Sequence, residues 1–166
     1  AIFQCLEGNR DKEIRRILLT CSGGPFRTWE KGEIAKATVE QAIKHPKWNM
    51  GTKISIDSAT LANKGLEVLE ARWLFDVPVE QVEVIVHPES IVHSMVEYQD
   101  RSILAQMGVP DMKLPIQYAL SYPERLELFN SQPLDLATVG TLHFAPADFA
   151  RYPLLGLAYE AGRKQG

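Results

Sequence analysis

The segment from Gly51 to Phe75, GTKISIDSATLANKGLEVLEARWLF, constrains the fold more than any other part of the sequence. Its β-branched run, Ile54-Ser55-Ile56, favours a strand. Asp57 followed by Ser58 is typical of a helix N-cap. An amphipathic helix is expected next, because apolar residues recur with a helical period. The predicted apolar stripe consists of Ala62, Leu66, Leu69 and Trp73.

Three polar residues of this helix form a candidate ligand site. Asn63, Lys64 and Glu67 fall within roughly a 100° arc of one helical face. An amide, an ammonium and a carboxylate beside a helix N-terminus can bind an anion and a cation side by side. Taken singly, Lys64 is typical of a solvated lysine and Glu67 of its i,i+3 partner. Gly65 costs a helix about 1 kcal/mol relative to alanine, so it indicates close approach of a ligand or another chain segment.

The remaining pattern predicts an α+β fold with a mixed or antiparallel sheet and helices packed on one face. Strands are predicted over Ile14–Thr20 and Val82–Val86, and a hairpin pairs Ile91–Tyr98 with Ser102–Met107. Helices are predicted over Thr38–Lys44, Pro110–Leu120 and Pro153–Lys164, and Ala1–Gln4 is typical of a helix start.

Composition sets wide bounds on function. The 166 residues, 45% of them hydrophobic, suffice for one domain with a core. A net charge of -3 gives no reason to expect nucleic acid or an acidic membrane as a partner. Cys5 and Cys21 do not make a disulfide framework, so the reducing cytoplasm is the expected compartment. No apolar run approaches the roughly 18 residues that a membrane span needs.

Other motifs taken alone are ambiguous. Ser22-Gly23-Gly24 after a strand offers a hydroxyl and unobstructed backbone N–H groups to a phosphate, although a tight turn before Pro25 is the simpler interpretation. The nucleotide-binding patterns GxxxxGK[ST] and GxGxxG do not occur. The loop His45–Gly51 is equally consistent with a lid over a ligand and with a loop anchored by Trp48. His87 and His93 lack the accompanying ligands of a metal site and are predicted to be structural.

Six motifs together resemble one enzyme family along essentially the whole chain. They are SGGPFRTW (22–29), HPKWNMG (45–51), KISIDSATLANKGLEVLEARWLF (53–75), HPESIVHSMVEYQD (87–100), MGVPDMKLPI (107–116) and FAPADFARYPLL (144–155). The sequence resembles the 1-deoxy-D-xylulose 5-phosphate reductoisomerases. The resemblance implies an NADPH-dependent rearrangement and reduction of that phosphosugar to 2-C-methyl-D-erythritol 4-phosphate, in bacterial non-mevalonate isoprenoid biosynthesis. It also implies a cytoplasmic homodimer.

The resemblance also implies roles for individual residues. Substrate and its phosphate are assigned to Ser22, His45, Trp48, Ser58, Asn63 and Lys64. Glu67 resembles one of three carboxylates that hold Mg²⁺ or Mn²⁺, which would polarise the substrate carbonyl as a Lewis acid. With Glu67, His45 and Trp48 make up the implied catalytic set, Trp48 in a lid that excludes water. Met50 resembles a lid residue against the nicotinamide, and Cys21, where the family usually has glycine or alanine, would border the same cofactor.

The same resemblance predicts that residues 1–166 are the central catalytic domain of a longer protein. In the family an Asp-Ser-Glu-His-Asn segment with two more metal carboxylates would end just before Ala1, preceded by an NADPH-binding domain. A helical C-terminal domain would follow Gly166. We therefore expect the isolated chain to be inactive. The alternatives are a non-catalytic phosphosugar-binding module, or a dimerisation module that pairs strands from Val82–Met107 across a subunit interface.

Overall fold

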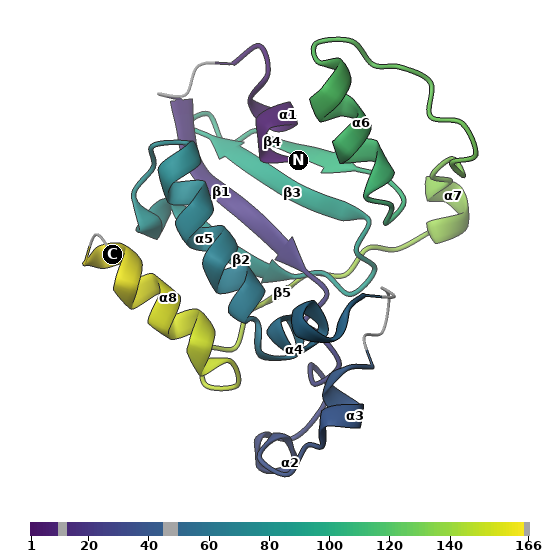
Figure 1. Ribbon diagram of the computed structural model, residues 1–166. Helices are drawn as coiled ribbons and strands as arrows, with labels where there is room; N and C mark the ends of the chain where they lie inside the picture. Colours follow the sequence, from purple (N-terminus) through teal and green to yellow (C-terminus); the bar gives the residue numbers. More distant parts are fainter. Residues whose placement is uncertain (10–12, 45–49, 165–166) are drawn as a thin grey trace.

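The computed structural model describes residues 1–9, 13–44 and 50–164, and it is built on one five-stranded sheet (Figure 1). The strand order is β4-β3-β1-β2-β5. The strands are β1 (Ile14–Cys21), β2 (Val82–Val86), β3 (Val92–Tyr98), β4 (Ile103–Met107) and β5 (Ala145–Pro146). Only β1 and β2 run parallel, and the other neighbours are antiparallel. The predicted mixed α+β sheet and its hairpin are confirmed.

Helices account for nearly half of the other described residues. They are α1 (Ile2–Leu6), α2 (Lys31–Ile34), α3 (Val39–Ala42), α4 (Thr52–Thr60), α5 (Ala62–Leu74), η2 (Val79–Gln81), α6 (Lys113–Ser121), α7 (Leu136–Val139) and α8 (Pro153–Arg163). In Figure 1, α5 lies across the sheet with α8 beside it, and α1 lies over β3 and β4. Within the described ranges, none of these helices has the length and apolarity of a bilayer-spanning segment.

The core lies on one face of the sheet. An extra residue of β1 opposite β3, between Ile14 and Arg16, forms a bulge that shifts the alternation of side chains. Ile14, Ile17 and Leu19 therefore all belong to the main buried cluster. The same cluster includes residues of α1, α5 and α8: Cys5, Leu6, Val68, Ala71, Leu155 and Tyr159. The prediction that helices pack on one face is confirmed.

Gly65 allows α8 to approach α5 closely. A Cβ at this position would lie 2.8 Å from the Ala158 Cβ and 3.6 Å from the Leu154 carbonyl oxygen. No side chain larger than hydrogen fits without displacing α8. The glycine therefore serves a second chain segment, as one of the two interpretations of the sequence proposed.

The strand predicted at Ile54-Ser55-Ile56 is wrong, because these residues lie inside α4. Ile54 and Ile56 are more than a third exposed, so a strand here would have no buried face to fill. The helix begins after Gly51, whose carbonyl accepts a hydrogen bond of 3.0 Å from the Ser55 hydroxyl. Lys53 adds an i,i+4 ion pair to Asp57. Local β-propensity is a weak preference that such contacts override.

The helix start and the apolar stripe were also misplaced. Asp57 and Ser58 lie in α4, so they do not cap a helix. The helix α4 ends at Thr60, and the next residue, Leu61, adopts φ 54° and directly precedes α5. Two members of the predicted stripe, Leu66 and Trp73, are 56% and 63% exposed. The buried positions of α5 are instead Lys64, Gly65, Val68 and Ala71. The predicted stripe is wrong because α8 and the sheet cover a different face of α5. On that face, glycine and alanine permit close packing.

His87 holds the turn between β2 and β3. Its ring is fully buried, and Nε2 accepts hydrogen bonds of 3.1 Å from the backbone N–H groups of Ile91 and Val92. Nδ1 lies 2.8 Å from the His143 carbonyl oxygen, and the ring stacks on Phe144. With both ring nitrogens bonded to backbone, the structural role predicted for His87 is confirmed.

Glu89, in the same turn, makes the fold sensitive to acid. Burial disfavours its charge, but hydrogen bonds from the side chain and backbone of His143 outweigh that effect and lower the carboxyl pKa from 4.5 to about 2. Because the folded pKa is depressed, this stabilisation is present above pH 4.5 and is lost as the pH falls towards 2. We expect Glu89→Gln to flatten the loss of stability in that window, measured by urea unfolding at several pH values. Glu160→Gln, at an exposed position on α8, is the control; equal pH profiles for wild type and Glu89→Gln would contradict the assignment.

Candidate functional site

One cavity of about 820 Å³ contains every predicted site residue that the structure describes. Its lining includes Cys21, Ser22, Met50, Ser58, Asn63, Lys64 and Glu67. These residues come from the end of β1 and the turn after it, from a position two residues before α4, and from α4 and α5. His45 and Trp48, also predicted, lie outside the described residues. Segments that are more than 30 residues apart in sequence thus converge on one space.

The turn after β1 brings two serines together. Gly23 and Gly24 adopt φ 82° and 65°, and the Gly24 N–H donates a 3.1 Å hydrogen bond to the Ser22 Oγ. A Cβ on Gly24 would lie 2.6 Å from the Ser58 carbonyl oxygen. The turn therefore needs glycine both for its left-handed backbone and for its contact with α4. This confirms the predicted tight turn and explains how Ser22 and Ser58, 8% and 6% exposed, reach the same cavity.

The first turn of α5 supplies the positive end of the site. Lys64 is only 8% exposed, and its Nζ lies 2.6 Å from the Glu67 Oε2. This confirms the predicted i,i+3 pair, although the burial of Lys64 is unlike a solvated surface lysine. The Asn63 Oδ1 is buried and has no hydrogen-bond partner among the described residues. Because a helix N-terminus also carries partial positive charge, the arrangement favours an anion that bears hydroxyl groups.

Cys21 lies close enough to Lys64 and Glu67 for their charges to act on it. Burial raises the pKa of the Cys21 thiol, the Glu67 carboxylate raises it further, and the Lys64 ammonium opposes the shift. The thiol is therefore neutral at physiological pH. It does not compete with an incoming anion for the charge of Lys64.

The described residues do not by themselves fit a divalent cation. Mg²⁺ needs several oxygen ligands in a near-octahedral array. No group of three or more His, Cys, Asp or Glu residues with metal-binding geometry occurs within residues 1–9, 13–44 and 50–164. The Glu67 carboxylate faces the cavity and is paired with Lys64. It offers one ligand position.

His93 is a cavity residue that sequence reasoning placed only in the core. It is half-buried as predicted, and its Nδ1 lies 2.9 Å from the Gln106 Oε1. Nε2 is buried, without a partner among the described residues, and burial lowers the pKa of the ring despite the hydrogen bond to Gln106. Asp111 and Met112, before α6, line the same cavity. No local pattern in the sequence signals these three residues, because His93 reaches the cavity through the pairing of β3 and the other two through the segment between β4 and α6.

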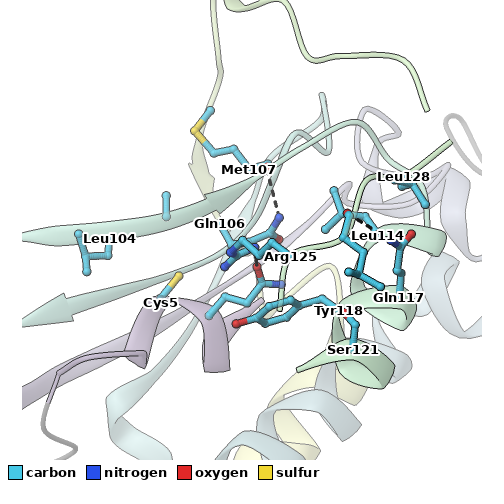
Figure 2. A pocket seen from close by; sticks show the side chains of 13 residues that line it. Cys5, Leu104, Gln106, Met107, Leu114, Gln117, Tyr118, Ser121, Arg125 and Leu128 are labelled. Carbon is cyan, nitrogen blue, oxygen red and sulfur yellow. Dashed lines mark hydrogen bonds between the residues drawn. The ribbon is translucent and has the colours of Figure 1, made fainter. Parts of the chain in front are cut away.

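A second cavity, of about 540 Å³, lies between α1, β4, α6 and the segment after α6 (Figure 2). Its polar side chains are committed to internal contacts. Gln117 donates to the carbonyls of Leu126 and Glu127, and Ser121 donates to the Glu124 carbonyl. The Arg125 guanidinium lies 4.3 Å from the Tyr118 ring centroid and donates to the Gln4 amide oxygen. These contacts hold the segment after α6 in place, so the larger cavity is the better site candidate.

Comparison with known proteins identifies the family from both ends of the chain. Residues 1–75 match the family model of the 1-deoxy-D-xylulose 5-phosphate reductoisomerase C-terminal domain. Residues 107–166 match that of the DXP reductoisomerase C-terminal domain. The 1-deoxy-D-xylulose 5-phosphate reductoisomerases of Geobacillus sp. (strain WCH70) and Bacillus subtilis (strain 168) are 57% and 55% identical over all 166 residues. The chain spans 44% and 43% of their lengths.

Solved structures agree with these matches. The Zymomonas mobilis reductoisomerase in complex with NADPH superposes with a TM-score of 0.90 at 49% identity, covering 100% of this chain and 42% of that one. A DOX-P reductoisomerase in complex with NADPH, fosmidomycin and magnesium gives 0.91 at 46% identity, covering 98% and 42%. The fold and the sequence matches therefore lead to one family. The chain belongs to the 1-deoxy-D-xylulose 5-phosphate reductoisomerases.

Proposed function

We propose that this chain is the substrate-binding, catalytic domain of an NADPH-dependent reductoisomerase that converts 1-deoxy-D-xylulose 5-phosphate to 2-C-methyl-D-erythritol 4-phosphate. One observation carries the proposal. The serine hydroxyls, the amide and the ammonium predicted to bind the substrate phosphate line a single cavity, mostly as buried groups. A buried cation is costly without an anionic partner. The partly exposed Glu67 accepts one hydrogen bond from the Lys64 ammonium, which has further N–H groups to donate to an anion.

In this proposal Lys64 and the hydroxyls of Ser22 and Ser58 bind the phosphate. A charge-assisted hydrogen bond from the Nζ of Lys64 supplies most of the affinity, and the hydroxyls fix the orientation. The Asn63 NH2 group donates to the phosphate, while its Oδ1 accepts from a sugar hydroxyl. His93, whose Nε2 has no hydrogen-bond partner among the described residues, lines the same cavity.

We further propose that NADPH and Mg²⁺ or Mn²⁺ act with these residues in the whole protein. Relatives solved with NADPH and with magnesium support the choice of groups. Glu67 would supply one metal ligand, and Cys21 and Met50 would border the nicotinamide. His45 would lie close to the substrate phosphate, and Trp48 would belong to a lid over the substrate. Since the described residues contain no group of three or more His, Cys, Asp or Glu that could hold a metal, we propose that turnover needs other parts of the whole protein, and we expect this chain alone to be inactive.

Exchange of the domain between relatives tests the proposal. This chain would replace the matching segment of the Geobacillus sp. (strain WCH70) reductoisomerase, and NADPH oxidation would be measured with 1-deoxy-D-xylulose 5-phosphate and Mg²⁺. We expect turnover by the chimera and none by the isolated chain. Glu67→Gln in the chimera should lower kcat at least 100-fold, on the order of 3 kcal/mol in the barrier, whereas Glu160→Gln should not. A folded chimera without turnover would contradict the function, and turnover by the isolated chain would contradict the need for other segments.

A second proposal concerns assembly as a homodimer in the bacterial cytoplasm. β4 is at one edge of the sheet, and its Ile103 and Leu104 are 49% and 43% exposed. An apolar edge strand is a surface that proteins commonly cover, which supports pairing through the β3–β4 hairpin. Sedimentation equilibrium should give a dimer that Leu104→Glu converts to a monomer. A wild-type monomer across the accessible concentrations would exclude this interface for the chain.

A further inference from the structure

We propose that Tyr152, a residue outside the cavity, positions the Ser22 hydroxyl for phosphate binding; this inference rests on the proposed function. Tyr152 directly precedes α8 and is 3% exposed. Its hydroxyl donates a hydrogen bond of 2.8 Å to the carbonyl oxygen of Gly23. A residue about 130 positions away thus holds the turn in which Ser22 lies.

The contact acts through a single peptide unit. In a trans peptide the C=O and the N–H point in opposite directions. The C=O of Gly23 and the N–H of Gly24 belong to the same unit, so the bond from Tyr152 fixes the direction of that N–H. The N–H in turn donates to the Ser22 Oγ. Tyr152, the Gly23–Gly24 peptide and Ser22 therefore form a continuous chain of hydrogen bonds that ends at the site.

The turn needs such an external contact because of its sequence. Both flanking residues are glycines with positive φ, and glycine has the widest choice of backbone conformations. Rotation of the peptide between them would turn the Gly24 N–H away from Ser22. The phenol is suited to prevent this, since burial raises the Tyr152 pKa to about 12 and keeps its proton in place at neutral pH.

Arg151 supports the same segment from the other end of the loop. Its guanidinium donates to the carbonyl oxygens of Phe26 (3.0 Å) and Trp29. Asp148 orders this arginine, because its carboxylate accepts from the backbone N–H of Arg151 at 3.2 Å. Residues 148–152 therefore contact the loop at Gly23, Phe26 and Trp29. These contacts place the Tyr152 hydroxyl opposite Gly23 independently of ligand.

Tyr159 provides a matched control. It lies on α8, is buried, and donates a 2.6 Å hydrogen bond to a backbone carbonyl, and its pKa is also raised by burial to about 12. Its acceptor, however, is Val82 at the start of β2, away from the turn. Tyr152→Phe and Tyr159→Phe each remove one buried hydrogen bond to a backbone carbonyl, so they should lower the thermal unfolding midpoint by similar amounts. Only the first should alter the site.

The experiment is calorimetric titration of the 166-residue chain and its variants with 1-deoxy-D-xylulose 5-phosphate. We expect Tyr152→Phe to raise Kd about tenfold and Tyr159→Phe to leave it within about twofold. In the Ser22→Ala background, Tyr152→Phe should cause no further loss, because a residue that acts through Ser22 has nothing left to position. Hydrogen exchange of the Gly24 amide provides a readout without ligand, and it should accelerate in Tyr152→Phe alone.

The outcomes separate this inference from the proposed function. Additive losses in the double variant, or equal effects of the two tyrosine substitutions, would overturn the positioning role while leaving phosphate binding intact. An unchanged Gly24 exchange rate in Tyr152→Phe would also overturn it. Failure of the unsubstituted chain to bind the phosphosugar would overturn the proposed function, and the inference that rests on it.

Discussion

Replacing Lys64 with alanine is expected to weaken binding of 1-deoxy-D-xylulose 5-phosphate to the chain at least 100-fold. Lys64 provides the one buried ammonium among the cavity-lining residues that the structure describes. Charge-assisted hydrogen bonds contribute about 1.5–3 kcal/mol each, and a low-dielectric surrounding favours the upper end. At about 1.4 kcal/mol per factor of ten, a loss of this size corresponds to roughly 100-fold in Kd.

Lys53→Ala is the matched control for that loss. Lys53 lies on α4, near the site in sequence, but its side chain is 86% exposed and pairs with Asp57. Its removal should change Kd less than twofold, since exposed ion pairs contribute little. Thermal unfolding would verify that both variants are folded. Binding by Lys64→Ala within a factor of two of wild type would show that the anion does not bind at this lysine.

Substituting Gly24 with alanine is expected to damage both stability and binding. A non-glycine residue at φ 65° costs about 1–2 kcal/mol. The new Cβ would also lie 2.6 Å from the backbone oxygen of Ser58, a position from which only displacement of α4 relieves the overlap. We expect a total loss of about 3 kcal/mol in the free energy of unfolding, together with loss of phosphosugar affinity as Ser22 and Ser58 separate.

Gly32→Ala is the control for the glycine substitution. Gly32 lies within α2, and a Cβ there meets no heavy atom within 4 Å. Alanine should be neutral or stabilising at this helical position. Urea unfolding of the two variants measures both effects. A Gly24→Ala protein as stable as wild type would mean that the turn and α4 are not in the tight contact described.

Four of the five strands could be predicted because their signals are local, whereas the two-residue strand β5 was missed. The apolar run of β1, the β-branched run of β2 and the β3–β4 hairpin each appear within fewer than 20 residues of sequence, and their predicted bounds differ by at most one residue from those in the structure. The path from α4 to α5 could not be predicted in this way. Leu61 adopts a left-handed conformation that is unusual for a branched residue, and only tertiary contacts hold it there. Because the sequence does not reveal the break between α4 and α5 at Leu61, Asp57 and Ser58 were predicted to start a helix.

The sequence predicted residues that line one cavity together, but it did not predict how deeply they are buried. The types and spacing of Asn63, Lys64 and Glu67 indicated a ligand face, and the family resemblance added Ser22 and Ser58. Burial of Lys64 depends on the approach of β1 and α4, which no periodicity encodes. Cavity residues from the hairpin, such as His93, were missed for the same reason. Their side chains enter the site through long-range strand pairing.

The most direct test of the phosphate site compares two ligands that differ only in the phosphate. The chain would be titrated calorimetrically with 1-deoxy-D-xylulose 5-phosphate and with unphosphorylated 1-deoxy-D-xylulose, each with and without Mg²⁺. We predict that the phosphosugar binds, that inorganic phosphate competes with it, and that Mg²⁺ leaves Kd nearly unchanged, because the described residues contain no group of three or more potential metal ligands. The sugar without phosphate should give no binding heat. Equal binding of both sugars, or binding of neither, would contradict a preformed phosphate site at Ser22, Ser58, Asn63 and Lys64.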